Sequence, residues 1–265
     1  MIRLIAADVD NTLVEEGTLR INPEYFEVIR ALREKGVLFV AASGRNAVST
    51  SRLFAPVKDE IGMISGSGAV WWKMGEPHVI SGIDYADILA FDADAQRIPG
   101  ADTIAETVDK VYIHPGNEDL RRFLGDGYGT DVFFTEGGTY PADASYVKIA
   151  VRQMKDLEET TRDLMHRWEK KLHLCYAGGM WLDALAPGCN KGSALARIQE
   201  DLGISASETA AFGDNGNDLE MLALAGFSCA VASARPEVKA AADRVIGPWQ
   251  EDSVLQEMKR ILSEL

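Results

Sequence analysis

The sequence predicts an α/β fold in which a doubly wound parallel sheet is interrupted by an inserted α+β segment. Three observations lead to this prediction: the first eighty residues alternate short apolar runs with amphipathic segments, the last third repeats that alternation, and the middle does not. Strands that alternate with helices indicate right-handed crossovers and therefore parallel strands. We expect residues 1–82 and 188–265 to form the core and residues 83–187 to form the insert.

The N-terminal part begins with a predicted strand over residues 3–7, a nearly continuous apolar run that ends at Asp8. Such runs are typical of strands covered on both faces. Asn22 and Pro23 favour the start of a helix, because Asn caps helices and Pro suits the first helical position, and Gly36 ends that helix. The same alternation predicts a strand at 37–42, a short helix through 48–53, a strand at 61–64, and a hairpin with strands at 71–73 and 78–80.

The middle of the chain combines helices with short strands of alternating polarity, which favours a sheet with helices on one side. The pattern predicts a helix after residue 82, strands at 111–114, 132–135, 146–152, 172–176 and 181–186, and a helix at 156–171.

The C-terminal third returns to strands that alternate with helices. A helix at 191–202 is expected to stop at Gly203, because glycine readily adopts the left-handed conformation that ends helices. The pattern then predicts a strand at 209–212, a helix through 219–222, a strand near 229–231, a helix that Pro236 opens, an edge strand at 244–246, and a last helix from Ser253.

Composition and charge limit the classes of protein that fit. The 265 residues are 46% hydrophobic and 26% charged, as in ordinary globular proteins. A formal net charge of −14 argues against nucleic acid or an anionic membrane as the main partner. The apolar runs are too short to span a bilayer, and the run before Asp8 is too short for a secretory signal. Three dispersed cysteines without zinc spacing favour a reducing compartment, the cytoplasm.

Polar residues stand where the predicted core strands end or a core helix begins, and ligands of open parallel sheets bind outside the carboxyl ends of the strands. The residues in these places are Asp8 and Asp10 after the first strand, Ser43, Gly44 and Arg45 after the second, Asn190 and Lys191 at a helix start, and Gly213 to Asp218 after a late strand. Each group alone is common in turns and helix caps. We therefore interpret them together.

The carboxylates of Asp8, Asp10 and Asp214 would repel one another at adjacent strand ends unless a cation lay between them. Mg²⁺ prefers such hard oxygen ligands and also takes a phosphate oxygen. Lys191 and the pair Ser43-Gly44 could hold the remaining phosphate oxygens. The combination predicts a site for phosphoryl transfer.

The segments that carry these residues resemble the motifs of the haloacid dehalogenase (HAD) superfamily. They are DVDNTL at 8–13, ASGR at 42–45, NKGSAL at 190–195 and GDNGND at 213–218. The insert between the second and third segments resembles the cap of the Cof-type hydrolases (subfamily IIB). The resemblance implies an HAD-like core with an α+β cap of the C2B type. It also implies a Mg²⁺-dependent phosphatase of small phosphorylated metabolites, such as sugar phosphates or phosphorylated cofactors, that forms an aspartyl-phosphate intermediate.

The resemblance implies roles for the charged residues. Asp8 matches the nucleophile, and Asp10 matches the general acid that protonates the leaving oxygen and then the base that activates water. The Mg²⁺ ligands would be the Asp8 carboxylate, the Asp10 carbonyl and Asp214, while Asp218 would hold the ion indirectly or through water. Lys191 matches the charge that steadies the nucleophile and the phosphoryl group.

Further residues match contacts to the substrate. Ser43 and the Gly44 amide match the phosphate clamp, and Asn217 matches another phosphate contact. Arg45 either reaches the substrate or pairs with a carboxylate. The insert offers further candidates for substrate contact on or beside its strands: Tyr112, His114, Lys148, Tyr176 and Trp181.

The chain departs from the family pattern at Asn11 in place of the usual Gly, at Ser67 in place of an Asn that precedes Gly-Ala, and at Ser233, where Asn is common. Asn11 still tolerates the backbone conformations of a turn. The last two departures leave the nucleophile, acid and lysine intact and bear on the contacts to the substrate. Two alternative functions remain open at this point. One is a sugar phosphomutase on the same scaffold, and the other is a binding or regulatory protein that kept the fold without catalysis.

Overall fold

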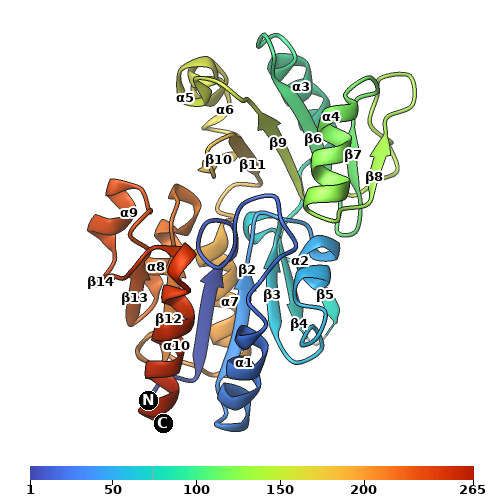
Figure 1. Ribbon diagram of the computed structural model, residues 1–265. Helices are drawn as coiled ribbons and strands as arrows, with labels where there is room; N and C mark the ends of the chain where they lie inside the picture. Colours follow the sequence, from blue (N-terminus) through green and yellow to red (C-terminus); the bar gives the residue numbers. More distant parts are fainter. Residues whose placement is uncertain (74) are drawn as a thin grey trace.

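The strands form two sheets, one built from both ends of the chain and one from its middle (Figure 1). The computed structural model describes residues 1–73 and 75–265, so Met74 in the predicted hairpin lies outside the described residues. In spatial order the first sheet contains β14 (Arg244–Val245), β13 (Phe227–Ala230), β12 (Thr209–Gly213), β1 (Leu4–Asp8), β2 (Leu38–Ala42), β3 (Gly62–Ser65), β4 (Val70–Lys73) and β5 (Glu76–Val79). The second contains β10 (His173–Ala177), β11 (Trp181–Leu185), β9 (Lys148–Arg152), β6 (Asp102–Glu106), β7 (Val111–Ile113) and β8 (Val132–Phe134).

The first sheet is parallel from β14 to β3 and becomes antiparallel at β4 and β5. Its strand order places β1 between β12 and β2, so that segments from opposite ends of the chain pair directly. All five residues of β1 are buried, as expected for a strand covered on both faces. The predicted fold class is confirmed.

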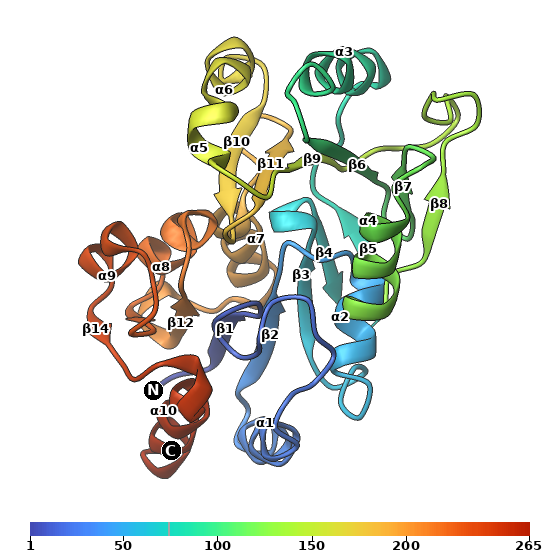
Figure 2. The same ribbon diagram turned by 45° about the horizontal axis from the view of Figure 1, so that its top comes forward.

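Helices cover both faces of the first sheet. Those outside the middle segment are α1 (Glu24–Glu34), α2 (Ala47–Leu53), α7 (Lys191–Leu202), α8 (Leu219–Leu224), α9 (Pro236–Ala241) and α10 (Ser253–Ser263). Helices α1 and α10 pack together on one face, while α7 and α8 pack together on the other (Figures 1 and 2). Helix α7 starts and ends as predicted, with Asn190 capping its N-terminus and left-handed Gly203 following its end.

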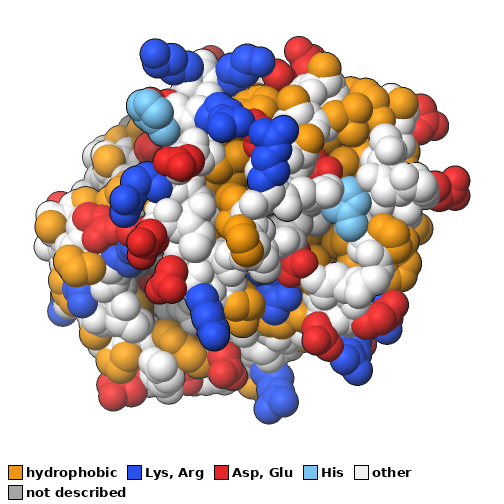
Figure 3. Space-filling view, turned by 90° about the horizontal axis from the view of Figure 1, so that it is seen from above, with side chains coloured by type: hydrophobic (Ala, Val, Ile, Leu, Met, Phe, Trp, Pro, Cys, Tyr) orange, Lys and Arg blue, Asp and Glu red, His pale blue; other side chains and the backbone are white. Residues whose placement is uncertain are grey.

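The second sheet is antiparallel except for the parallel pair β7 and β8. The helices of this part are α3 (Tyr85–Ala95), α4 (Glu118–Arg122), α5 (Leu157–Thr160) and α6 (Arg162–Trp168). Figure 1 shows this sheet above the carboxyl ends of β1 and β2. Seen from above, the molecule carries Lys and Arg side chains interspersed with Asp and Glu (Figure 3). Among the described residues, no helix is both long and apolar enough to cross a bilayer.

One prediction for the middle segment was wrong, and one strand was missed. The helix expected at 156–171 is broken into α5 and α6 at Thr161, whose hydroxyl donates a hydrogen bond to the Leu157 carbonyl 2.6 Å away. Such side-chain bonds to the preceding turn often bend helices. Strand β6 was not predicted, because acidic residues occupy both of its ends. Its Glu106 lies opposite Lys148 of β9, so pairing between the strands supplies the partner that the local sequence does not show.

Gly68 lies against the backbone at the start of α7, and a substitution there tests how closely the two segments pack. Gly68 has a φ of +114°, and a Cβ atom there would lie 2.2 Å from the backbone of Asn190. We expect Gly68→Ala to lower the free energy of unfolding by about 2 kcal/mol or more, because neither the backbone nor its neighbour can accommodate a side chain. Urea denaturation measures the change. Gly125→Ala, at a position with open space, is the control, and equal stability of the two variants would contradict the prediction.

Candidate active site

The residues that the sequence singled out lie at the carboxyl edge of the first sheet. Asp8 is the last residue of β1, Ser43 follows β2, Asp214 follows β12, and Lys191 begins α7. Because β1 pairs in parallel with both β2 and β12, these positions meet at one edge although they are separated by up to two hundred residues.

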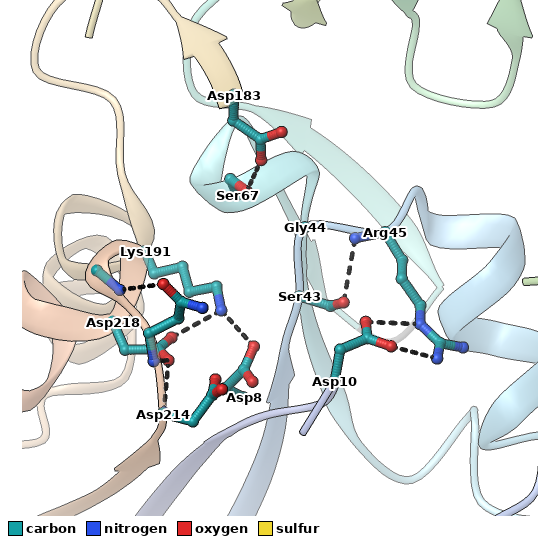
Figure 4. Close-up of polar contacts among 12 residues, drawn as sticks. Asp8, Asp10, Ser43, Gly44, Arg45, Ser67, Asp183, Lys191, Asp214 and Asp218 are labelled. Carbon is teal, nitrogen blue, oxygen red and sulfur yellow. Dashed lines mark hydrogen bonds and ion pairs between the residues drawn. The ribbon is translucent and has the colours of Figure 1, made fainter. Parts of the chain in front are cut away.

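A buried lysine joins two of the carboxylates (Figure 4). The Lys191 ammonium donates hydrogen bonds to Asp8 Oδ1 and to Asp218 Oδ1, the latter at 2.7 Å, and Lys191 has no exposed surface. Burial alone lowers the pKa of this lysine, but Asp218 and Asp8 outweigh that effect and hold its pKa above the usual range. The lysine is therefore charged, and it offsets part of the negative charge at this edge.

Three carboxylates here are placed to hold a metal ion. Asp8, Asp214 and Asp218 each offer an oxygen, and these oxygens lie within 4.8 Å of one another. Burial and the neighbouring charges, Asp218 for Asp8 and Asp8 for Asp214, raise the pKa of both acids. A cation between them would offset this repulsion, and carboxylate oxygens suit a hard divalent ion.

The oxygens of Asp218 are already occupied. Oδ1 accepts from Lys191, and Oδ2 accepts from the backbone amides of Asp214 and Asn215 at 2.9 and 3.1 Å. These bonds leave Asp8 and Asp214 as the carboxylates free to face an ion. This arrangement fits the indirect metal role expected for Asp218, which stays a prediction.

The Asp10 carboxylate points away from this cluster and toward Arg45 (Figure 4). Arg45 Nε and Nη2 donate to its two oxygens at 2.9 and 2.6 Å, which is the bidentate geometry of strong arginine–carboxylate pairs. Of the two roles left open for Arg45, the structure shows the pairing with a carboxylate. The atom of Asp10 expected to bind metal is its main-chain carbonyl, so the side-chain pairing leaves that prediction open.

The residues expected to bind phosphate lie beside these carboxylates. Gly44 and Asn217 line the same pocket as Asp8 and Asp214. Ser43 is fully buried, and its hydroxyl accepts a hydrogen bond from the Arg45 amide at 3.1 Å. Their roles stay predictions.

The second sheet closes the pocket from above. Of the five candidates in the middle segment, Lys148 and Trp181 are among the residues that line the described pocket, whereas Tyr112, His114 and Tyr176 are not. Sequence reasoning missed four charged or aromatic lining residues: Glu16, Glu106, Tyr128 and Asp183. The available signal for Asp183 was a lone carboxylate within the apolar strand β11.

Of the three departures from the family pattern, Ser67 contacts this upper layer directly, and Asn11 is linked to it through Glu16. Asn11 is left-handed, with φ of 60°, and its amide donates to Glu16 at 3.4 Å, which also accepts from the Tyr128 hydroxyl at 3.4 Å. Ser67 is also left-handed, and its hydroxyl donates to Asp183. The third departure, Ser233, is exposed.

A parallel sheet with clustered carboxylates and a buried lysine at its carboxyl edge, under a second sheet, defines the class of HAD-like proteins. A model of the family described as haloacid dehalogenase-like hydrolase matches residues 5–258. The chain belongs to this family.

Comparisons with individual proteins agree with this assignment. The chain is 26% identical to the Escherichia coli 5-amino-6-(5-phospho-D-ribitylamino)uracil phosphatase YbjI, over 98% of the chain and 96% of that protein. It is 25% identical to the HMP-PP phosphatase of Serratia proteamaculans, over 96% and 93% of the two chains. The solved structure of BT4131, a sugar phosphatase of HAD subclass IIB, superposes with a TM-score of 0.83 at 25% identity over 98% of each chain.

The chain is thus a Cof-type HAD hydrolase and an enzyme, a phosphoric monoester hydrolase. The alternative of a non-catalytic binding protein is set aside on this evidence. A hydrolase releases inorganic phosphate, whereas the phosphomutase alternative would yield an isomerised sugar phosphate.

The contribution of the buried Lys191 to the free energy of unfolding can be tested. We expect Lys191→Met to lower the free energy of unfolding by about 3–5 kcal/mol in metal-free buffer, because Asp8 and Asp218 lose their shared buried counter-charge. Adding Asp218→Asn to this variant should recover part of the loss, since one unpaired charge disappears. Guanidinium denaturation of the three proteins measures both effects, and a single variant as stable as wild type would refute the expectation.

Proposed function

We propose that the protein is a Mg²⁺-dependent phosphatase that hydrolyses small phosphorylated metabolites through an aspartyl-phosphate intermediate. One observation carries this proposal: Lys191 is buried between Asp8 and Asp218 with Asp214 beside them, and Asp8 and Asp214 line a pocket. Asp8 lines that pocket, and its neighbours supply the charges that a phosphoryl group and an ion require.

The proposed reaction begins with attack by an Asp8 oxygen on phosphorus. The bond from phosphorus to the ester oxygen breaks, and Asp10 gives a proton to that leaving oxygen. Asp10 then takes a proton from water, which attacks the aspartyl phosphate, releases inorganic phosphate and restores Asp8. Lys191 steadies the charge on Asp8 and on the phosphoryl oxygens, while Ser43, the Gly44 amide and Asn217 hold those oxygens.

The Asp10–Arg45 pair bears on the proton transfer. Both residues line the pocket, and the guanidinium fixes the Asp10 carboxylate by two hydrogen bonds. A bound phosphate ester would compete for the same guanidinium, so substrate binding can free Asp10 to turn toward the leaving oxygen. Catalytic hydrogen bonds often form only in the complex with substrate.

The proposed ligands of Mg²⁺ are the Asp8 carboxylate, the Asp10 carbonyl and Asp214, with Asp218 orienting Lys191 and the Asp214 backbone. The fit rests on the oxygen donors of Asp8 and Asp214 and on their mutual repulsion in a buried place. When bound, Mg²⁺ would neutralise charge on the phosphoryl oxygens and orient them for attack.

We further propose that residues 83–187 form a cap domain over a core of residues 1–82 and 188–265. All strands of the second sheet fall within 102–185, and this part has apolar clusters of its own. Polar contacts join the two parts around the pocket, including Lys148 to the Gly44 carbonyl at 2.6 Å and Ser49 to the Tyr128 carbonyl at 2.5 Å. Such a cap would exclude water during the reaction and read the leaving group.

The role of Asp8 can be tested with p-nitrophenyl phosphate and Mg²⁺. We expect Asp8→Asn to lower kcat by about 10³-fold or more, because the amide is a far weaker nucleophile. The matched control is Asp119→Asn on the exposed face of α4, which should retain wild-type turnover. Equal hydrolysis by Asp8→Asn and wild type would overturn the mechanism. With a hexose phosphate as substrate, released inorganic phosphate supports the phosphatase, and an isomerised sugar phosphate supports the mutase.

Metal binding can be tested separately from activity. In EDTA-treated protein we expect Asp214→Asn to raise Tm by about 2–4 °C, because one of the crowded carboxylates loses its charge. Added Mg²⁺ should raise the Tm of wild type and leave that of Asp214→Asn unchanged. Differential scanning fluorimetry measures both. An Mg²⁺-dependent increase in the variant as large as in wild type would rule out Asp214 as a ligand.

A further inference from the structure

A buried ionic cluster forms the roof of the pocket. Lys148 of β9 lies 2.9 Å from Glu106 Oε1 and 3.6 Å from Asp183 Oδ2, and all three side chains are almost fully buried. The same ammonium donates to the Gly44 carbonyl of the core at 2.6 Å. Lys148 is therefore held by a hydrogen bond to one sheet and by two ion pairs within the other.

Glu106, in contrast, has an acceptor to spare. Its Oε1 pairs with Lys148, but its buried Oε2 has no hydrogen-bond partner among the residues that the structure describes. Glu106 is 3% exposed and lines the pocket. A buried carboxylate oxygen without a donor is costly. Because Glu106 lines the pocket, a ligand bound there can supply the missing donor.

The carboxylates of the pocket disfavour a ligand that carries a negative group in addition to its phosphate. Six carboxylates line the pocket against two cations, Arg45 and Lys148. Arg45 is paired with Asp10, and Lys148 with Glu106 and Asp183, so both cations are already matched by carboxylates. Arg45 Nη1 has no hydrogen-bond partner among the described residues, but in the proposed reaction the phosphate ester itself engages this guanidinium. The rest of the pocket then holds more carboxylates than cations. An anionic leaving group would be repelled, whereas a hydroxyl or an N–H group meets acceptors.

Part of the remaining surface of the roof is apolar. Ile104, Val111, Leu124 and Trp181 line the pocket on the side of the second sheet. A carbon skeleton or a flat ring packs against such a surface, and an aromatic ring offers a face for it.

We infer that Glu106 determines specificity: the leaving group of the physiological substrate is uncharged and carries a hydroxyl or N–H that donates to Glu106 Oε2. This inference rests on the proposed function and narrows its substrate class. It favours monophosphate esters of neutral, hydroxyl- or nitrogen-rich compounds. It excludes esters that bear a carboxylate or a second phosphate on the leaving group.

Two matched pairs of substrates test the inference on the wild-type enzyme. Glycerol 3-phosphate carries a hydroxymethyl group where 3-phosphoglycerate carries a carboxylate. Glucose 6-phosphate likewise has a neutral end where 6-phosphogluconate has a carboxylate. We expect kcat/KM, measured by phosphate release with Mg²⁺, to favour the neutral member of each pair by about tenfold or more. Equal kcat/KM values within each pair, or a preference for the acidic members, would overturn the inference. The inference would also be overturned if an enzyme active on p-nitrophenyl phosphate turned over none of the four substrates.

Variants at the roof assign the preference to Glu106. Glu106→Gln keeps the size of the side chain and offers an amide N–H to a substrate carboxylate, so the preference for neutral esters should fall about tenfold. This change leaves the buried Lys148 with less counter-charge. The triple variant Glu106→Gln, Lys148→Met, Asp183→Asn therefore removes the three charges of the cluster together, so that no buried charge is left unpaired. The control is Glu118→Gln on the exposed helix α4, which should keep the wild-type preference.

The outcomes separate the two levels of the proposal. A preference unchanged in both folded Glu106 variants would refute the role of Glu106. If wild type releases no phosphate from p-nitrophenyl phosphate in an Asp8-dependent manner, the proposed function itself fails, and the inference about the leaving group fails with it.

Discussion

The site depends on the burial of like charges at the ends of parallel strands. Pairing of β1 with β12 brings Asp8 and Asp214 together, and the backbone amides after β12 hold Asp218 beside them. In a place with little water, this concentration of carboxylates is unfavourable unless cations lie among them. Lys191, without exposed surface, offsets part of the charge. Its own removal from water is costly, so the arrangement persists only because the surrounding sheet and helix fix each member.

The same physical solution occurs on the opposite side of the pocket. Lys148 lies among the carboxylates of the second sheet and reaches the Gly44 carbonyl of the first. The two buried lysines have different proposed roles. Lys191 serves the carboxylates that would react with phosphorus, whereas Lys148 fixes the layer that would contact the rest of the ester. Asn11 and Ser67, two departures from the family pattern, support this second layer through Glu16 and Asp183.

Much of the core could be predicted because neighbouring residues in the sequence indicate its strands and helices. An apolar run covered on both faces predicts β1, and Asn190 and Gly203 mark the ends of α7. The middle segment was less predictable. Strand β6 has acidic ends that its pairing with β9 accommodates, and the helix break at Thr161 coincides with hydrogen bonds from threonine hydroxyls to the preceding turn. The positions of the candidate site residues could also be predicted, since each follows a strand or begins a helix.

The sequence by itself determined the strand–helix alternation, the charged residues at the strand ends, and the family that these resemble. It could do so because apolar periodicity and turn chemistry are properties of neighbouring residues. Only the tertiary structure decided which charges pair: Arg45 with Asp10, Lys191 with Asp8 and Asp218, and Lys148 with Glu106. Such pairings follow from strand register and from the way that elements pack, and an interaction between residues distant in the chain leaves no local pattern in the sequence.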